Sequence, residues 1–243
     1  MARTDPLGNV RLYLRIGGVL LFALLVFPIL VLAPLFRVRD YVAPFILGFV
    51  GRIVGLRVRV DGKPRPRALY LANHESWLDI LALGGCSRTV FVAHSGLAGH
   101  PVLRWLCQQN ETVFISRDVR SSVAQQVGQV REALGDRPLT IFPEGTTNDG
   151  EMILPFRSSL LAAVESLGHE VPVQPVALEY ADAPNTCWYG DEPGMANIRR
   201  VLSRRGRIDL TAHFLDPLAG DALTNRKTMA GTAQQAIAER LKR

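Results

Sequence analysis

Cysteine, aromatic residues and clustered basic charge are all scarce in this sequence. The three cysteines, Cys86, Cys107 and Cys187, lie far apart and form no CxxC or Cys/His pattern. Neither a disulfide framework nor a metal site is therefore indicated, and we expect reduced thiols in a domain that faces the cytosol. Aromatic residues make up 7% of the 243 residues. No basic run with interleaved aromatics is present, which disfavours nucleic-acid binding.

Two common catalytic signatures are also missing. Gly145 is not part of a G-x-x-x-x-G-K phosphate loop, and no lysine follows it. The segment 95–99 lacks the flanking pattern of a G-x-S-x-G nucleophile elbow, and Ser76 has no oxyanion-hole signature beside it. A lipase-like hydrolase is therefore disfavoured.

Positive charge and hydrophobic residues are what the chain has in excess. Lysine and arginine outnumber aspartate and glutamate by 28 to 22, which gives a net charge of +6. A basic protein attracts phosphates of nucleic acid, of an anionic membrane or of phosphorylated substrates. Hydrophobic residues make up 48% of the chain. The roughly 190 residues beyond the N-terminal region are enough for one α/β domain with a buried core.

The N-terminal region carries the longest apolar stretch. Residues 16–36 contain no charged side chain, and as a helix they would measure about 31 Å, roughly the hydrocarbon thickness of a bilayer. Pro28 and Pro34 interrupt this helix, and arginines flank both ends, so the positive-inside rule gives no orientation. These features favour a helical hairpin or re-entrant anchor over a single spanning helix. An interfacial helix is expected over 41–57.

The rest of the chain alternates short apolar strands with helical patterns, which is typical of an α/β fold. We place the membrane anchor at 1–55 and the α/β domain at 56–243. Strands are expected at 56–60, 68–72, 89–93, 112–115, 139–142, 171–178 and 208–214, and helices at 77–85, 101–107, 119–134, 156–167 and 224–241. The prolines in 171–178 favour an edge strand or a strand start. Trp105 is expected in the core.

His74 follows the strand at 68–72, and Asp79 lies five residues further on, in the first turns of a helix. A carboxylate at this position can hold one imidazole nitrogen and leave the other free to accept a proton from a substrate hydroxyl. Ser76 is placed to cap the helix. The same spacing is also typical of a surface histidine beside a helix N-terminus, where an acidic residue is favoured in any case.

Two further strands deliver polar residues to their carboxyl ends. Arg117 follows the strand at 112–115, and a guanidinium there is suited to two-pronged phosphate binding or to an ion pair with Asp118 or Asp79. Glu144 and Gly145 follow the strand at 139–142. Gly145 allows a ligand close to the backbone, and a glutamate at a strand end needs a partner.

Four of these stretches, in this order, resemble the 1-acylglycerol-3-phosphate acyltransferases of the glycerolipid acyltransferase family. Residues 73–79 match its NHxxxxD motif, and 113–117 resemble its second block, a strand that ends in arginine. Residues 142–146 match FPEGT, and 173–176 match a fourth, proline-containing block. The resemblance covers about residues 40–215 and implies a mixed, largely parallel sheet flanked by helices.

In that family the histidine is the general base and the aspartate orients it, which assigns these roles to His74 and Asp79. The resemblance implies substrate contacts for Asn73, Ser76, Arg117, Phe142, Pro143, Glu144, Gly145, Thr146 and Arg157. The acceptor hydroxyl attacks an acyl thioester of coenzyme A or acyl carrier protein directly. The expected partners are thus the bilayer, a lysolipid acceptor and one of these acyl donors, without cofactor, metal or nucleic acid.

The resemblance implies that the enzyme makes phosphatidic acid, with its catalytic domain on the cytoplasmic face of the cytoplasmic membrane. Many phosphate-accepting members have arginine directly after FPEGT, where this chain has Thr147. That departure weakens the argument for a phosphate headgroup, although Arg157 could compensate. The alternative acceptor is lyso-ornithine lipid, whose headgroup lacks phosphate. A non-catalytic lipid-binding role is disfavoured by the intact His74 and Asp79, and 182–195 is expected to be a loop over the sheet edge.

Overall fold

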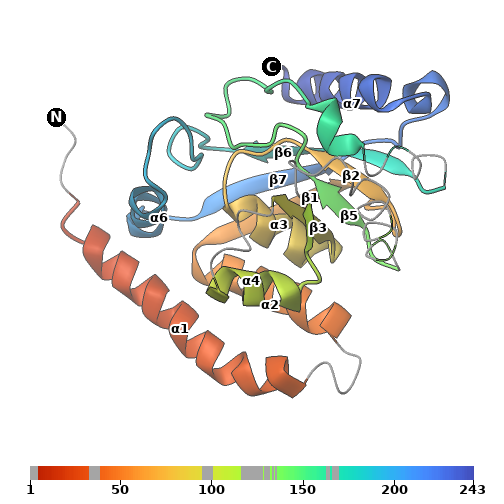
Figure 1. Cartoon of the computed structure of the whole chain (residues 1–243). Helices are drawn as coiled ribbons and strands as arrows, with labels where there is room; N and C mark the ends of the chain where they lie inside the picture. Colours follow the sequence, from red (N-terminus) through yellow and green to blue (C-terminus); the bar gives the residue numbers. More distant parts are fainter. Residues whose placement is uncertain are drawn as a thin grey trace.

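The computed structural model of the chain describes residues 5–32, 39–94, 101–115, 128, 132, 134, 136–162, 165 and 170–243. The elements are α1 (Gly8–Leu32), α2 (Arg39–Ile53), β1 (Leu56–Gly62), β2 (Leu69–Ala72), α3 (Leu78–Ser87), β3 (Val90–His94), α4 (Pro101–Gln109), β4 (Val113–Ile115), β5 (Leu139–Ile141), the 3₁₀ turn η3 (Ser158–Leu161), β6 (Val173–Tyr180), α6 (Gly194–Ser203), β7 (Ile208–Phe214), the 3₁₀ turn η5 (Gly220–Leu223) and α7 (Arg226–Leu241). Figure 1 shows their arrangement.

The seven strands form one mixed sheet in the order β1-β7-β6-β2-β5-β3-β4. Every neighbouring pair is parallel except β6 and β7. The carboxyl ends of β2, β3, β4, β5 and β6 consequently meet at one edge of the sheet. This arrangement confirms the predicted α/β fold with a largely parallel sheet, and it places the predicted motifs together because ligands bind beyond such strand ends.

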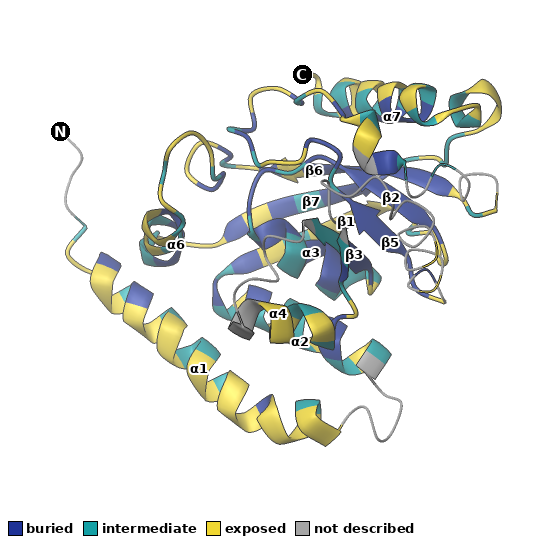
Figure 2. Ribbon diagram, viewed as in Figure 1, coloured by how far each residue is buried: buried dark blue, intermediate teal, exposed yellow. Residues whose placement is uncertain are grey.

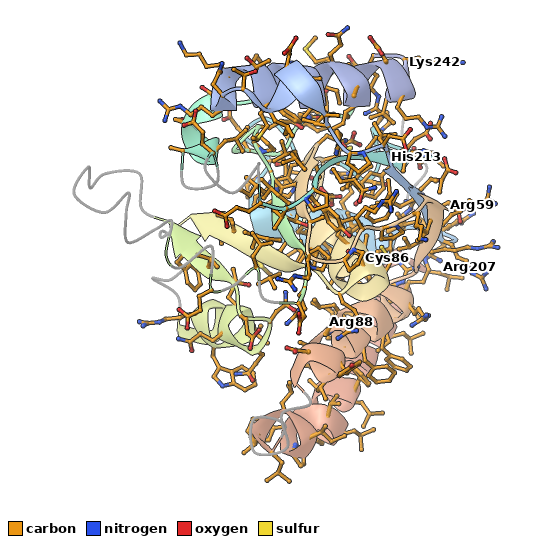
Figure 3. The ribbon with its side chains drawn as sticks, turned by 90° about the vertical axis from the view of Figure 1, so that its right-hand side faces the viewer. Arg59, Cys86, Arg88, Arg207, His213 and Lys242 are labelled. Carbon is orange, nitrogen blue, oxygen red and sulfur yellow. The ribbon has the colours of Figure 1, made fainter. Side chains whose placement is uncertain are left out.

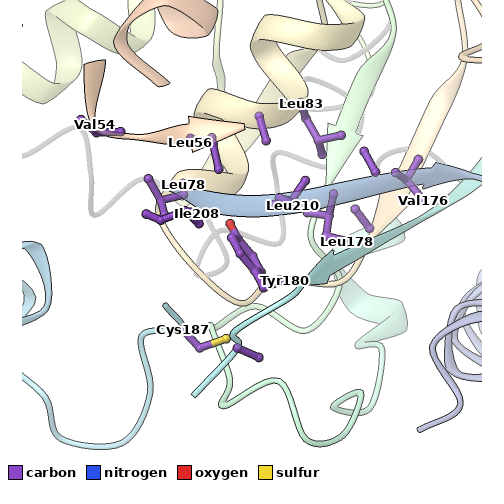
Figure 4. Packing of buried hydrophobic residues seen from close by; sticks show 14 of the residues in the cluster. Val54, Leu56, Leu78, Leu83, Val176, Leu178, Tyr180, Cys187, Ile208 and Leu210 are labelled. Carbon is purple, nitrogen blue, oxygen red and sulfur yellow. The ribbon is translucent and has the colours of Figure 1, made fainter. Parts of the chain in front are cut away.

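Helices cover both faces of the sheet, α3 and α2 on one side and α7 on the other (Figure 1). One apolar cluster fills the α3 side with residues from β1, β2, β6, β7 and α3, among them Leu56, Tyr70, Leu83, Leu178 and Leu210 (Figure 4). The other cluster packs Met229, Ala233 and Ile237 of α7 against the strands. The strands are therefore buried on both faces, as expected for a parallel sheet.

The prediction that the proline-containing strand lies at an edge is wrong, since β6 lies third in the sheet between β7 and β2. Pro175 is tolerated because of where its missing N–H would point. The carbonyl of Pro175 accepts a hydrogen bond from Leu215 N–H. In an extended strand the nitrogen of the same residue points the same way, so the Pro175 nitrogen also points toward Leu215. On that side the side-chain amide of Gln174 donates to Leu215 O at 2.8 Å, in place of the N–H that proline lacks.

Three other expectations differ from the structure. Of the helix expected at 156–167, the described residues show the 3₁₀ turn η3, and most of 119–134 lies outside them. Helix α6 was not predicted. Trp105 is 37% exposed, and its ring lies 6.2 Å from that of Phe27 of α1. Trp105 thus contacts the N-terminal helix and is not part of the core.

Helix α1 lies outside the α/β domain, and α2 packs between α1 and α3 (Figures 1 and 2). Helix α1 is long and apolar enough to cross a bilayer, with mean hydropathy 2.5, and only 6% of its most apolar 18 residues are buried. Its side chains Arg11 and Arg15 donate to backbone carbonyls at the C-terminal end of α6, among them those of Ser203 and Leu202. Helix α2 returns against α3.

Candidate active site

The strand end of β2 and the first turn of α3 bring His74 and Asp79 together. His74 Nδ1 lies 2.8 Å from Asp79 Oδ2. The imidazole remains 20% exposed, whereas Asp79 is fully buried. Because the carboxylate accepts from Nδ1, the proton resides on that nitrogen, and Nε2 is left with its lone pair.

Asp79 is held by more than the imidazole. Its Oδ2 also accepts the backbone N–H groups of Glu75 and Ser76, at 2.8 and 3.0 Å. Its Oδ1 accepts the hydroxyl of Tyr180 at the end of β6, at 2.5 Å. An ionised carboxylate only accepts, so four donors fix its position without conflict. Tyr180 was missed from the sequence because β6 becomes a neighbour of β2 only in the folded sheet.

The β5 strand end supports His74 from the other side. The Phe142 ring stacks on the imidazole, with centroids 4.2 Å apart and planes 20° apart. Glu144 Oε1 accepts the backbone N–H of His74 at 2.9 Å. The FPEGT stretch therefore positions the histidine, through a ring contact and a hydrogen bond to its backbone.

Glu144 is buried, at 1% exposure. Its Oε2 accepts from the Asn148 amide at 2.5 Å and from the Leu154 N–H at 3.2 Å. Burial raises the pKa of Glu144 to about 7, against these hydrogen bonds and that from His74, which lower it. Asn148 is a second residue that the sequence did not single out.

A second buried carboxylate, Glu75, lies behind the His74–Asp79 pair. The Asn73 amide donates to Glu75 Oε1 at 2.9 Å, and Arg243 forms an ion pair with the same oxygen. Burial raises the pKa of Glu75, and Arg243 opposes this shift. Asn73 also joins β2 to β6, because its side chain accepts from Leu178 N–H and donates to Leu178 O.

A cavity of about 780 Å³ opens in front of His74. Its inner part is apolar and is lined by Trp77, Ile80, Phe91, Val92, Ala93 and Ile141, with Cys107 and Thr112 further along. Gly145, Thr146 and Thr147 line it on one side, and residues 188–194 on the other. An apolar interior with a few polar groups near the base is the form expected of a lipid-binding cleft.

The structure separates the predicted site residues into two groups. His74, Phe142, Gly145 and Thr146 line the cavity. Asn73, Ser76, Pro143 and Glu144 are buried and absent from its described lining, so they support the residues that line it. The Ser76 hydroxyl lies 3.4 Å from Leu78 N–H, a weak cap.

The two predicted arginines are placed differently. Arg157 is exposed, and its backbone N–H donates to Pro143 O, but its side chain is not among the described lining residues. Arg117 lies outside the described residues, although β4, which precedes it, ends at the same sheet edge as β2. Within the described part of the chain, no cluster of histidine, cysteine and acidic side chains could hold a metal ion.

Fold and site together define a lipid acyltransferase, and comparison with known proteins agrees. The Acyltransferase family model matches residues 57–179, and the chain belongs to this family. This confirms the resemblance found in the four sequence blocks.

The relatives include lyso-ornithine lipid O-acyltransferases and 1-acyl-sn-glycerol-3-phosphate acyltransferases. A lyso-ornithine lipid O-acyltransferase of Rhodobacter capsulatus is 34% identical, covering 81% of this chain and 74% of the relative. One of Brucella abortus is 30% identical over 95% of this chain and 94% of the relative. The 1-acyl-sn-glycerol-3-phosphate acyltransferase of Neisseria gonorrhoeae is 35% identical over 53% of this chain and 51% of its own.

A solved structure has the same fold along nearly the whole chain. The 1-acyl-sn-glycerophosphate acyltransferase PlsC of Thermotoga maritima superposes with a TM-score of 0.65 and 19% identity, covering 97% of this chain and 98% of its own.

Proposed function

We propose that this protein is an O-acyltransferase that transfers a fatty acyl group from a thioester donor, acyl-CoA or acyl-ACP, to the hydroxyl of lyso-ornithine lipid. The observation that carries the proposal is the His74–Asp79 pair, with Nδ1 held at 2.8 Å and the ring facing an apolar cavity. The cavity offers one base and space for acyl chains, which is what acyl transfer from an activated donor requires.

The reaction follows from the free nitrogen of His74. Nε2 accepts the proton of the lipid hydroxyl as its oxygen attacks the thioester carbonyl. The C–O bond forms, the C–S bond breaks, and the departing thiolate takes the proton back from the imidazolium. A positioned base contributes about 10²–10⁴-fold, and orientation of two bound substrates supplies much of the rest.

The lining of the cavity supports the ornithine headgroup. Asp191 and Glu192 line the cavity, and its described lining includes no lysine or arginine. Glu192 is paired with Arg200, whereas Asp191 is exposed and has no ion pair within the described residues. A carboxylate favours the ammonium of ornithine over a phosphate. The R. capsulatus and B. abortus relatives carry the corresponding names.

The second candidate acceptor is 1-acylglycerol-3-phosphate, with phosphatidic acid as product. It is supported by the N. gonorrhoeae relative and by Arg117, which follows a strand that ends at the His74 edge. The two candidates share all the chemistry at His74. They differ only in the lipid headgroup that the cavity must bind.

A membrane location completes the proposal. Helix α1 exposes large apolar side chains over most of its length (Figure 2), including Leu20, Leu24 and Leu25. The α1–α2 pair would insert into the cytoplasmic membrane, with the catalytic domain on its cytoplasmic face. The sequence boundary between anchor and domain, at residues 55 and 56, stays a prediction.

The test uses the purified full chain with one labelled acyl-CoA and a panel of lysolipids, with products identified by mass spectrometry. We expect lyso-ornithine lipid to give the highest kcat/KM. His74→Ala should reduce kcat by about 10²–10⁴-fold and leave the unfolding midpoint within a few degrees. Preference for 1-acylglycerol-3-phosphate would select the second candidate. Full activity of His74→Ala would refute the acyl-transfer mechanism.

A further inference from the structure

A second cavity, of about 510 Å³, lies on the other side of α3 from the active site. Leu81 and Gly85 of α3 line it, whereas Trp77 and Ile80 of the same helix line the cavity of His74. The rest of its wall comes from the C-terminal half of α2, the beginning of β1 and the residue before β7. The acyl-transfer reaction makes no use of this space.

Three arginines from three different elements line this cavity: Arg52 of α2, Arg57 of β1 and Arg207 before β7. All three are exposed, and within the described residues none has an ion pair or a side-chain hydrogen bond. Arg204 and Arg205, close by in sequence, are paired with Asp182 and Asp5. The arginines that line the cavity are thus ones without a carboxylate partner among the described residues.

The surroundings favour an anion. Figure 3 shows Arg207 on the same side of the molecule as Cys86 of α3, which also lines the cavity. In the sheet register, the acidic residue opposite Arg57 is Asp209 of β7. Asp209 does not line the cavity. Gly48, Gly51, Gly55 and Gly85 belong to the uncharged part of the wall.

The cavity also lies at the base of the N-terminal helix pair. Helix α2 ends at Ile53, three residues before β1 begins, and Arg15 of α1 donates to Gly206 O, next to Arg207. If α1 and α2 enter the bilayer, this junction lies at the depth of the lipid headgroups. Basic side chains at that depth are attracted to anionic lipids.

We propose that Arg52, Arg57 and Arg207 form a binding site for the phosphodiester of an anionic membrane phospholipid, separate from the acceptor site. Arginine forks bind phosphate oxygens in pairs, and three forks around one cavity suit a single phosphate. The inference rests on the proposed insertion of α1 and α2 into a membrane, and it does not depend on which lysolipid is acylated. A phospholipid bound there would connect the end of α2 to the α/β domain.

The test is native mass spectrometry of the full chain in a neutral detergent, titrated with phosphatidylglycerol or with phosphatidylcholine. Wild type should retain one phosphatidylglycerol at concentrations where phosphatidylcholine is not retained. Arg57→Gln with Arg207→Gln should weaken this retention about 30-fold, from the usual contribution of a basic residue near anionic lipid. Arg59→Gln with Lys63→Gln is the matched control. It removes the same charge from exposed positions of β1 and its loop and should retain the lipid as wild type does.

Three outcomes would overturn the proposal. Equal loss in both double variants would show a general charge effect, and equal retention of the two phospholipids would show no headgroup site. Displacement of the lipid by millimolar glycerol phosphate would indicate a site for soluble phosphates. Since the readout is bound lipid, a failed acyl-transfer assay would refute the proposed function and leave this inference standing. Unchanged acyl transfer to a short-chain lysolipid would show that the double variants are folded.

Discussion

At the scale of single residues, the base is positioned by a short chain of hydrogen bonds. His74 depends on Asp79 for its tautomer, and Asp79 depends on Tyr180 and on two backbone N–H groups for its place. Each donor comes from a different part of the β2–α3 turn or from β6. A disturbance in β6 should therefore reach the catalytic ring without any contact to substrate.

Tyr180→Phe tests this dependence, because it keeps the buried ring and removes only the hydroxyl on Asp79. We expect kcat to fall roughly tenfold with little change in KM, since a hydrogen bond to a charged group contributes about 1.5–3 kcal/mol. Tyr70→Phe is the matched control. Tyr70 is also fully buried, but its hydroxyl donates to Arg65 O, away from the site. Equal loss of kcat in both variants would mean that Tyr180 does not act through Asp79.

Glu144 should make the stability of the protein depend on pH. Burial raises its pKa from 4.5 to about 7, so the folded chain holds this proton where the unfolded chain has lost it. The corresponding stability, roughly 3 kcal/mol, is fully present below pH 4.5 and is lost as the pH rises through about 7. As the pH rises from 4.5 to about 7, the unfolding midpoint of Glu144→Gln should fall less than that of wild type.

The matched control for this experiment is Glu151→Gln, a nearby exposed residue. Its midpoint should follow the wild-type pH dependence, because this substitution leaves Glu144 and its hydrogen bonds in place. Parallel curves for wild type and Glu144→Gln would show that Glu144 is ionised in the folded protein throughout this range.

At the scale of elements, the sequence predicted the strands well and the supports of the site poorly. Runs such as 68–72 and 208–214 are short, apolar and bounded by turns, and each is a strand in the fold. The position of β6 could not be predicted from its prolines, because strand order is set by pairing across the whole sheet. Tyr180 was missed for the same reason, because only the folded sheet brings it to Asp79. Asn148 lies four residues after Glu144, but no sequence pattern marks its amide as a partner of that carboxylate.

The cavity wall shows the same limit. The motif residues His74, Phe142, Gly145 and Thr146 line the cavity. The segment 188–194 lines it too, although its sequence carries no motif. It is held in place by contacts distant in sequence, such as the backbone bond from Trp188 N–H to Glu75 O. A loop fixed in this way gives no periodic signal that could be interpreted beforehand.

The contact between α2 and α3 requires glycine, which leads to a prediction for these helices. A Cβ added at Gly85 would lie 2.6 Å from Gly48 Cα and 2.9 Å from Gly48 N, both backbone atoms. Gly85→Ala must therefore push α2 from α3, and we expect a loss of about 1–3 kcal/mol in the free energy of unfolding. Chemical unfolding in detergent micelles would measure it.

Gly231→Ala in α7 serves as the control for Gly85→Ala, since a Cβ there would meet no atom within 4 Å. Alanine is the better helix former, so this variant should gain about 0.5–1 kcal/mol. The two substitutions are chemically identical and should change stability in opposite directions. A gain in both would contradict the close crossing of α2 and α3.

At the scale of the whole molecule, both ends of the N-terminal helix pair are attached to the catalytic domain. Arg11 and Arg15 join the first turns of α1 to the end of α6, and α2 continues into β1 after two residues. The part of α1 beyond Arg15, residues 16–32, would measure about 26 Å, less than the roughly 30 Å of a hydrocarbon core. The pair therefore favours insertion from one face over a full crossing.

This arrangement predicts that the start of α1 and the catalytic domain lie on the same side of the membrane. Leu7 and Met195 are both well exposed, at 56% and 76%, and serve as reporters on α1 and α6. In a background with Cys86→Ser and Cys107→Ser, Leu7→Cys and Met195→Cys should react with a membrane-impermeant thiol reagent in inside-out vesicles. Neither should react in intact spheroplasts.

If α1 spans the membrane, only the Leu7→Cys reporter should change its reactivity. Leu7→Cys would then react in spheroplasts while Met195→Cys stayed protected, and the hydrogen bonds of Arg15 to α6 could not exist in the membrane. Arg15→Gln separates these cases further, because it weakens the attachment that keeps the helix start on the domain. If the hairpin is correct, this variant should keep both reporters on the same side, since α2 still returns the chain against α3. Exposure of Leu7→Cys in spheroplasts only when Arg15 is replaced would mean that Arg15 alone decides the topology.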